Sequence, residues 1–162
     1  MRYKVNNDNG AIRLCVDNFI RLVEASDVNP AERLKALPSL LDHLAVSVHL
    51  TKFACDNHAY PDPPPIDYNA TRALVSAHFP SLGYYNLADP TTKNIGTASI
   101  MVGDGIDDLA DIYNDLRETV WRWENTSERD ALWHLTNSFR SHWEFHLRSL
   151  QYYLYMLASE ID

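Results

Sequence analysis

The sequence predicts an all-α protein, an up-and-down helical bundle of four main helices plus a short helix, with a long irregular loop over residues 80–103. Three observations lead to this fold class. Apolar residues recur every three or four positions in five segments, which is the period of an amphipathic helix. The last two segments are the longest and repeat nearly as heptads. Residues 80–103 lack this period, and so long a stretch without it is unusual inside a compact domain.

Size and composition are those of a globular protein with one domain. The 162 residues are 46% hydrophobic and 22% charged, which is ordinary for such proteins. We therefore expect a single domain over residues 1–162 and treat the proline-rich segment 58–67 as a connector within it. The 14 Lys and Arg against 22 Asp and Glu leave a net charge of −8. This acidity argues against nucleic-acid binding, which requires a concentrated basic surface.

The same features predict where the protein is found. No apolar run approaches the roughly 18 residues of a membrane span, and the first ten residues are polar, unlike a secretory signal. The two cysteines are too few for a disulfide scaffold or a cysteine-rich zinc site. We therefore expect a cytoplasmic protein that does not associate with membranes.

The first helices are predicted from their apolar faces and their end signals. The first runs from about Asn9 to Ala25. Asn29-Pro30 combines a capping side chain with a proline at the first helical position, so a second helical segment starts there and extends to about Asn57. Pro38 lies inside this segment. Because proline lacks an N–H and its ring clashes with the preceding turn, we expect a split into a short lead-in and a longer helix from about Ser39.

The middle of the chain is predicted to hold one short helix between two irregular stretches. Four prolines within five residues make 58–67 a stiff extended connector. A short helix follows over 68–78 and ends before Pro80. The stretch 80–103 contains several apolar residues, so we expect a loop laid over the helices, with room for one short strand pair.

The last two helices are predicted over residues 104–124 and 127–159. Each carries an apolar seam with steps of three and four residues. A short connection near Asn125-Thr126 makes them antiparallel neighbours. In the final helix the predicted seam includes Phe139, His142, His146 and Leu150. Aromatic residues outside this seam (Trp121, Trp133, Tyr152 and Tyr155) are covered by the 80–103 loop or form a protein interface, including one between two copies of the chain.

An acidic row marks one face of the penultimate helix. On a helical wheel its members fall within about 100°, opposite the apolar seam. They are Asp104, Asp107, Asp108, Asp111, Asp115 and Glu118. Three interpretations stay open: a solvated face, a docking surface for a basic protein partner, or ligands for a hard cation.

His142 and His146 are the candidate chemical residues of the final helix. Four residues apart, they share a face and could bind one metal ion or act as an acid–base pair, completed by His49 or Asp56 across the bundle. The simpler alternative is two core histidines, each hydrogen-bonded to a neighbour. The glutamate of an H-E-x-x-H motif is absent because Trp143 follows His142. His134 maps to an outward face and is expected at the surface.

Two segments resemble a known family. Residues 103–116 read G-D-G-I-D-D-L-A-D-I-Y-N-D-L, similar to a D-D-L-A-D-I-Y-x-D-L signature, and residues 139–146 are similar to its companion F-x-x-H-W-x-x-H. Both are similar to signatures of an uncharacterised bacterial helical family, known only as a domain of unknown function. The resemblance implies a mostly helical cytosolic protein and brings no activity, substrate or cofactor. It points to one cluster of residues: Asp107, Asp108, Asp111, Asp115, His142 and His146.

Two functions follow as hypotheses. The first is a non-enzymatic module that binds a protein partner, a basic one if the acidic row is the docking surface, with no cofactor. The second is a metal-binding bundle, hydrolytic in one version, that uses His142, His146 and carboxylates around a divalent ion. The helical wheel turns the aspartates away from the final helix, so we expect the imidazoles inside and the carboxylates in water. This placement favours the first hypothesis.

Overall fold

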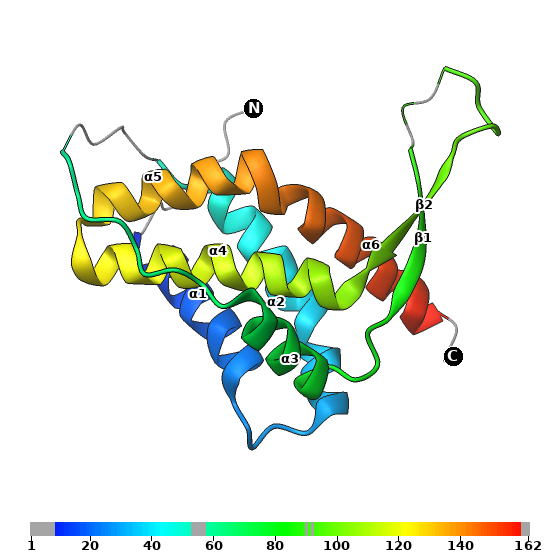
Figure 1. Cartoon of the computed structure of the whole chain (residues 1–162), viewed down its shortest axis with the longest axis horizontal. Coiled ribbons are helices and arrows are strands. Elements are labelled where there is room, and N and C mark those ends of the chain that lie inside the picture. Colours follow the sequence, from blue (N-terminus) through cyan, green and yellow to red (C-terminus); the bar gives the residue numbers. More distant parts are fainter. Residues whose placement is uncertain (1–8, 53–57, 90, 92, 160–162) are drawn as a thin grey trace.

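The computed structural model describes residues 9–52, 58–89, 91 and 93–159, and its elements are shown in Figure 1. The fold is predominantly helical, which confirms the predicted class. The elements are α1 (Asn9–Glu24), α2 (Pro30–Leu50), α3 (Tyr68–His78), β1 (Tyr84–Ala88), β2 (Ile100–Asp104), α4 (Gly105–Asn125), α5 (Glu128–Ser138), the π-helical segment η1 (Phe139–Trp143) and α6 (Glu144–Ser159). Among the described residues, no helix is long and apolar enough to cross a membrane.

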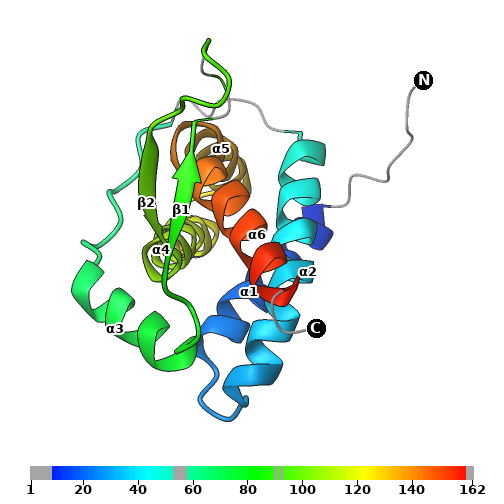
Figure 2. The same cartoon turned by 90° about the vertical axis from the view of Figure 1, so that its right-hand side faces the viewer.

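Helix α4 is the centre of the bundle. It packs against α1 and α3 on one side and against α5, η1 and α6 on the other, as Figures 1 and 2 show. Its fully buried residues, Leu109, Ile112 and Leu116, join one core with residues from the other helices. Because α4 has neighbours on both sides, the edge of its apolar face runs along the final helix, and we call this line of contact between α4 and the final helix the groove.

Helix α2 differs from its predicted form. Asn29 caps it through a 2.8 Å hydrogen bond from the Ala31 N–H, as expected, but the helix continues through Pro38 without a split and ends at Leu50. A proline inside a helix removes one hydrogen bond. Leu37 and Leu41, both fully buried, flank this position and hold the helix against the core. The predicted extension to 57 reaches residues 53–57, which include Asp56 and lie outside the described residues.

The final helix runs from α5 through η1 to α6, so its predicted extent is right while its predicted inward face is wrong. The inward positions are Leu132, Leu135, Phe139, Trp143, Leu147, Leu150 and Leu154. The steps from Phe139 to Trp143 and on to Leu147 are both four residues, and the first spans the π-helical segment. A π-turn holds one residue more than an α-turn, so it sets back the face of every later residue by about 100°. His142 and His146 therefore leave the seam.

Residues 80–103 were predicted as an irregular loop laid over the helices, with room for one short strand pair. The strand pair is present, whereas the expected position over the helices is corrected. Strands β1 and β2 pair antiparallel, with Tyr85 opposite Gly103 and Leu87 opposite Met101. The resulting β-hairpin projects from the end of the bundle at the start of α4 and beside α6 (Figures 1 and 2). The exposure of β1 alternates along the strand, because successive side chains of a strand point to opposite faces. It is the connector 58–67, free of helix and strand, that approaches Trp121: Pro63–Ile66 and Trp121 line one small cavity.

Candidate metal site between α4 and the final helix

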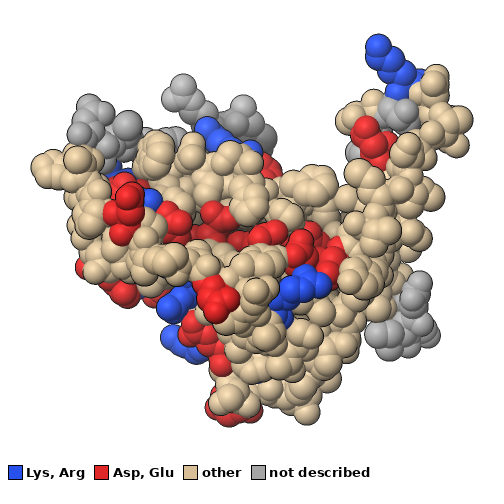
Figure 3. Space-filling view, viewed as in Figure 1, with Lys and Arg blue, Asp and Glu red and all other residues tan. Residues whose placement is uncertain are grey.

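Acidic side chains of α4 alternate with histidines of the final helix along one groove. On the face shown in Figure 3, acidic side chains form a band over α4. The contacts along it are Asp108–His146, Asp111–His146, Asp115–His142, Asp115–His134 and Glu118–His134. We call this set of seven residues the acid–histidine row. Residues three or four positions apart lie on the same face of a helix, so the acidic residues line one face of α4 and the histidines line the facing side of the final helix.

His146 is held between two carboxylates. Its Nδ1 lies 2.8 Å from Oδ1 of Asp108, and its Nε2 lies 3.4 Å from Oδ2 of Asp111. The hydrogen bond with Asp108 raises the pKa of His146, although its burial acts in the opposite direction. Burial raises the pKa of Asp111, with the His146 charge working against that rise. A positive charge at this point is therefore favourable for both carboxylates.

His142 repeats the pattern closer to solvent. Its Nδ1 lies 2.6 Å from Oδ2 of Asp115, while its side chain is 50% exposed. The rings of His142 and His146 meet edge to face with centroids 5.1 Å apart. In both residues Nδ1 is engaged by a carboxylate, so Nε2 is the nitrogen left for a further partner.

Three of these residues converge on one point. Asp111, His142 and His146 each offer a ligand atom, and these atoms all lie within 4.8 Å of one another. A tetrahedral ion with bonds of about 2.1 Å separates its ligand atoms by about 3.4 Å, and the Nε2–Oδ2 distance of His146 and Asp111 is 3.4 Å. The donor set of two imidazoles and one carboxylate suits zinc or ferrous iron.

Asp108 and Asp115 orient these histidines. Metal-binding histidines commonly donate their second N–H to a carboxylate, which fixes the ring and its tautomer. The Asp108 side chain is only 7% exposed and also accepts a 2.5 Å hydrogen bond from the Tyr85 hydroxyl of the β-hairpin. Burial, with the hydrogen bond to Asp108, raises the pKa of Tyr85, so its phenol stays a donor.

His134 and Tyr85 are site residues that the sequence reasoning missed. His134 was expected at the surface, but its Nδ1 lies 3.3 Å from Oε1 of Glu118 and its side chain is 12% exposed. Burial lowers the pKa of His134. On an uninterrupted helix His134 lies about 100° from His142 and His146, and the π-turn brings all three onto one face. The signal available in the sequence was the spacing of the three histidines, eight residues from His134 to His142 and four from His142 to His146.

The structure brings together most, but not all, of the predicted cluster. Asp108, Asp111, Asp115, His142 and His146 meet in the groove. Asp107 instead faces α3, where it accepts hydrogen bonds from Tyr68 and from Arg72, the latter at 3.1 Å. The expectation that the aspartates point away from the final helix is wrong, because the flank of α4 that carries them forms one wall of the groove.

His49, the third predicted metal ligand, lies against another side of the final helix. Its ring packs edge to face on Phe139, and its Nε2 lies 3.2 Å from Arg148 and 3.8 Å from Glu144. The three-residue cluster that converges in the groove contains Asp111 in place of His49.

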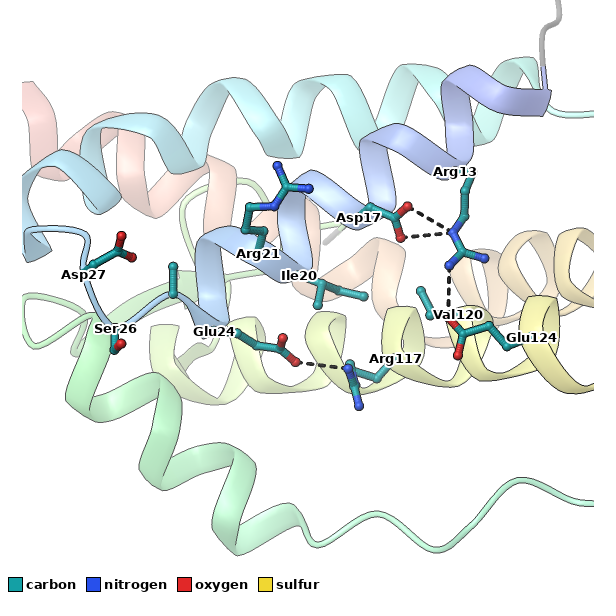
Figure 4. A pocket seen from close by; sticks show the side chains of 11 residues that line it. Arg13, Asp17, Ile20, Arg21, Glu24, Ser26, Asp27, Arg117, Val120 and Glu124 are labelled. Atoms are coloured by element: carbon teal, nitrogen blue, oxygen red, sulfur yellow. Dashed lines mark hydrogen bonds and ion pairs between the residues drawn. The ribbon is translucent and has the colours of Figure 1, made fainter.

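A second charged hollow lies between α1 and α4, with a volume of about 550 Å³ (Figure 4). Arg13 pairs there with Asp17 at 3.0 Å and with Glu124 at 3.2 Å, and Arg117 pairs with Glu24 at 3.1 Å. The pairs of Arg13 with Glu124 and of Arg117 with Glu24 link the two helices across the hollow. Two of its arginines are thereby neutralised within the protein, so the hollow is less suited to an anionic ligand.

Comparison with known proteins establishes the family. The fold and the site define the class: a predominantly helical protein in which acidic residues of one helix face histidines of another. The chain belongs to the family described as a domain of unknown function (DUF5063), whose model matches residues 15–159. A crystal structure of protein BF1032 from Bacteroides fragilis shares the fold, with a TM-score of 0.73 and 16% sequence identity. The match covers 93% of this chain and 92% of that chain. A search among curated proteins finds no match.

Proposed function

We propose that the protein binds a divalent transition-metal ion through Asp111, His142 and His146. The observation that carries this proposal is the convergence of the three ligand groups while a carboxylate engages the Nδ1 of each histidine. Core histidines would be buried among apolar side chains, but His142 is half exposed. The arrangement therefore supports the second of the two functions predicted from the sequence.

Such a site is open to chemistry. Three protein ligands leave at least one coordination position for water or a substrate, as in catalytic zinc centres. An ion held by Asp111, His142 and His146 would lower the pKa of such a water toward neutrality and would supply hydroxide for hydrolysis. The exposure of His142 gives solvent access to this side of the groove. Metal-assisted hydrolysis is thus the reaction class that the geometry favours.

Metal titration of purified protein tests the proposal. After treatment with a chelator, the protein is titrated with zinc and with cobalt(II), whose visible spectrum reports coordination. We expect one ion per chain. The substitutions Asp111→Asn, His142→Gln and His146→Gln should each lower affinity by about 100-fold or more, because each removes a ligand.

The control is His49→Gln. His49 also packs against the final helix, on Phe139, but it is not one of the three residues of the cluster. This variant should bind metal like the wild type. Equal affinity in all four variants, or stoichiometric metal lost only in His49→Gln, would contradict the proposed ligand set. Circular dichroism of each variant separates ligand loss from unfolding.

Protein binding, the other predicted function, is favoured by a different observation. Residues at the surface of the β-hairpin include apolar side chains that are mostly exposed: Tyr84, Ile95, Ile100 and Val102. Exposed apolar clusters mark interaction surfaces more often than random positions do. The acidic row is a weaker surface for a basic partner, since histidines and arginine already pair with it. A protein that binds no metal in the titration above would make protein binding the better function.

A further inference from the structure

The β-hairpin touches the site through one side chain. Tyr85 of β1 stacks on Tyr153 of α6, with ring centroids 4.6 Å apart and planes 10° apart. Its hydroxyl donates to Oδ2 of Asp108, and Ser149 of α6 also hydrogen-bonds to it. Asp108 in turn binds Nδ1 of His146 through its other oxygen. A continuous path therefore leads from the hairpin to a proposed metal ligand.

The hairpin is built to seat this ring. Tyr85 lies across from Gly103 on β2, and a Cβ at position 103 would lie 2.3 Å from Cζ of Tyr85. Gly105, the first residue of α4, is packed less closely, with a Cβ there meeting Tyr153 at 3.0 Å. Both glycines thus leave room for the stacked tyrosines, and a larger residue at position 103 would have to displace the Tyr85 ring.

Resting on the metal site proposed above, we propose that Tyr85 is a positioning residue of that site and couples metal binding to the β-hairpin. A metal ion on Nε2 of His146 leaves the remaining imidazole proton on Nδ1. Asp108 then accepts one hydrogen bond from Nδ1 and one from Tyr85, which holds the carboxylate in a single orientation.

The coupling acts in both directions. Asp108 is shared between the two contacts, accepting from Tyr85 on Oδ2 and binding Nδ1 of His146 on Oδ1. A metal ion that fixed the His146 ring would also fix Asp108, and so favour the seated position of Tyr85. By linkage, a seated Tyr85 raises metal affinity by the same factor. An isolated two-stranded hairpin is only marginally stable, so its position responds to a single such contact.

The test uses Tyr85→Phe, which keeps the stacked ring and removes the hydroxyl. The matched control is Tyr84→Phe, whose hydroxyl belongs to the neighbouring, largely exposed tyrosine. Zinc affinity should fall about 10-fold in Tyr85→Phe and stay unchanged in Tyr84→Phe. In wild-type protein, zinc should slow hydrogen exchange of amides in 84–88 and 100–104, and this response should be lost in Tyr85→Phe.

A double-mutant cycle guards against a purely structural effect. If Tyr85 acts through Asp108, Tyr85→Phe should lower affinity no further in an Asp108→Asn background. Two results would overturn the coupling but not the metal site. One is equal zinc affinity in Tyr85→Phe and in the wild type; the other is wild-type zinc binding that leaves hydrogen exchange in the hairpin unchanged. A wild-type protein that binds no zinc or cobalt overturns both.

Discussion

At the scale of single residues, His146 shows how a short contact sets the charge of the groove. It lies between Asp108 and Asp111, and the hydrogen bond with Asp108 raises its pKa above the ordinary value of about 6.5. The folded state therefore favours the protonated ring more than the unfolded chain does. That contribution to stability is complete below about pH 6.5 and disappears as the pH rises through the folded-state pKa. His134, whose pKa is lowered by burial, acts with the opposite sign.

His146→Gln should therefore destabilise the metal-free protein in a pH-dependent manner. At pH 5.5 the substitution removes a hydrogen bond between charged groups, which is worth about 1.5–3 kcal/mol. At pH 8.5 the loss should be smaller, because less of the wild-type ring is then protonated. Urea unfolding at both pH values, in the presence of a chelator, measures the difference. A loss of equal size at pH 5.5 and 8.5 would show that His146 is not charged in the folded protein.

At the scale of secondary-structure elements, the π-helical segment decides which side chains enter the groove. Trp143, fully buried, donates from its indole N–H to Oγ of Ser138 at 3.0 Å, a bond that ties the two sides of the segment together. The extra residue of the π-turn puts Trp143 and Leu147 into the core and turns the histidines toward α4. π-turns are often found at functional sites.

The helices could be predicted from the sequence, whereas the π-helical segment and the helix face that it sets could not. Apolar spacing and capping residues such as Asn29 specify helices locally, so the helices and the antiparallel pairing of the last two were predictable. The π-turn has no local signature, and a wheel drawn for a regular helix placed His142 and His146 inside. The aspartates were placed in water because the wheel assumed one packed face for α4. A short strand pair was allowed for in residues 80–103, but its register was not predicted, because Tyr85 and Gly103 pair only once the chain is folded.

Deleting Ser141, an exposed residue of the π-helical segment, should convert the segment to a regular α-turn. Because the deletion removes the one residue that the π-turn adds, Trp143 stays in the core and the histidines stay in the groove. We expect wild-type zinc affinity and a free energy of unfolding that is unchanged or higher, because a regular α-turn replaces the π-turn.

The control for this deletion is Ser141→Ala, which keeps the chain length. As an exposed substitution it should change stability by no more than about 0.5 kcal/mol. Urea unfolding and zinc titration of both variants are the measurements. A folded deletion variant that lost zinc binding would show that the extra residue of the π-turn does not set the face of the helix.

At the scale of the whole molecule, the groove concentrates the negative charge of a chain whose net charge is −8. Asp108, Asp111, Asp115 and Glu118 are each less than a quarter exposed, so their mutual repulsion is poorly screened. The histidines and Arg122 offset part of it, and Arg122 also bridges Glu118 to Asp130 of α5 at 2.8 and 2.9 Å. A divalent cation would offset most of the remainder.

Zinc should therefore raise the melting temperature of the protein. At a free zinc concentration 100 times the dissociation constant, binding to the folded state alone stabilises it by about 2.7 kcal/mol. For a chain of this size that corresponds to a rise of about 5–11 °C. Thermal unfolding followed by circular dichroism, with and without zinc, checks the value. Asp111→Asn should show no rise under the same conditions, and magnesium should have little effect because the site contains two imidazoles.

The two walls of the groove belong to one helical hairpin, formed by α4 and the final helix. The contacts of Asp115 with His142 and of Asp108 with His146 join residues 27 and 38 positions apart, whereas the ion pair of Arg13 with Glu124 spans 111 positions. Closing the shorter loops costs about 1 kcal/mol less conformational entropy. The C-terminal third of the chain can thus bring its carboxylates and imidazoles together before the N-terminal helices dock, and those helices then bury the apolar side of an already assembled pair.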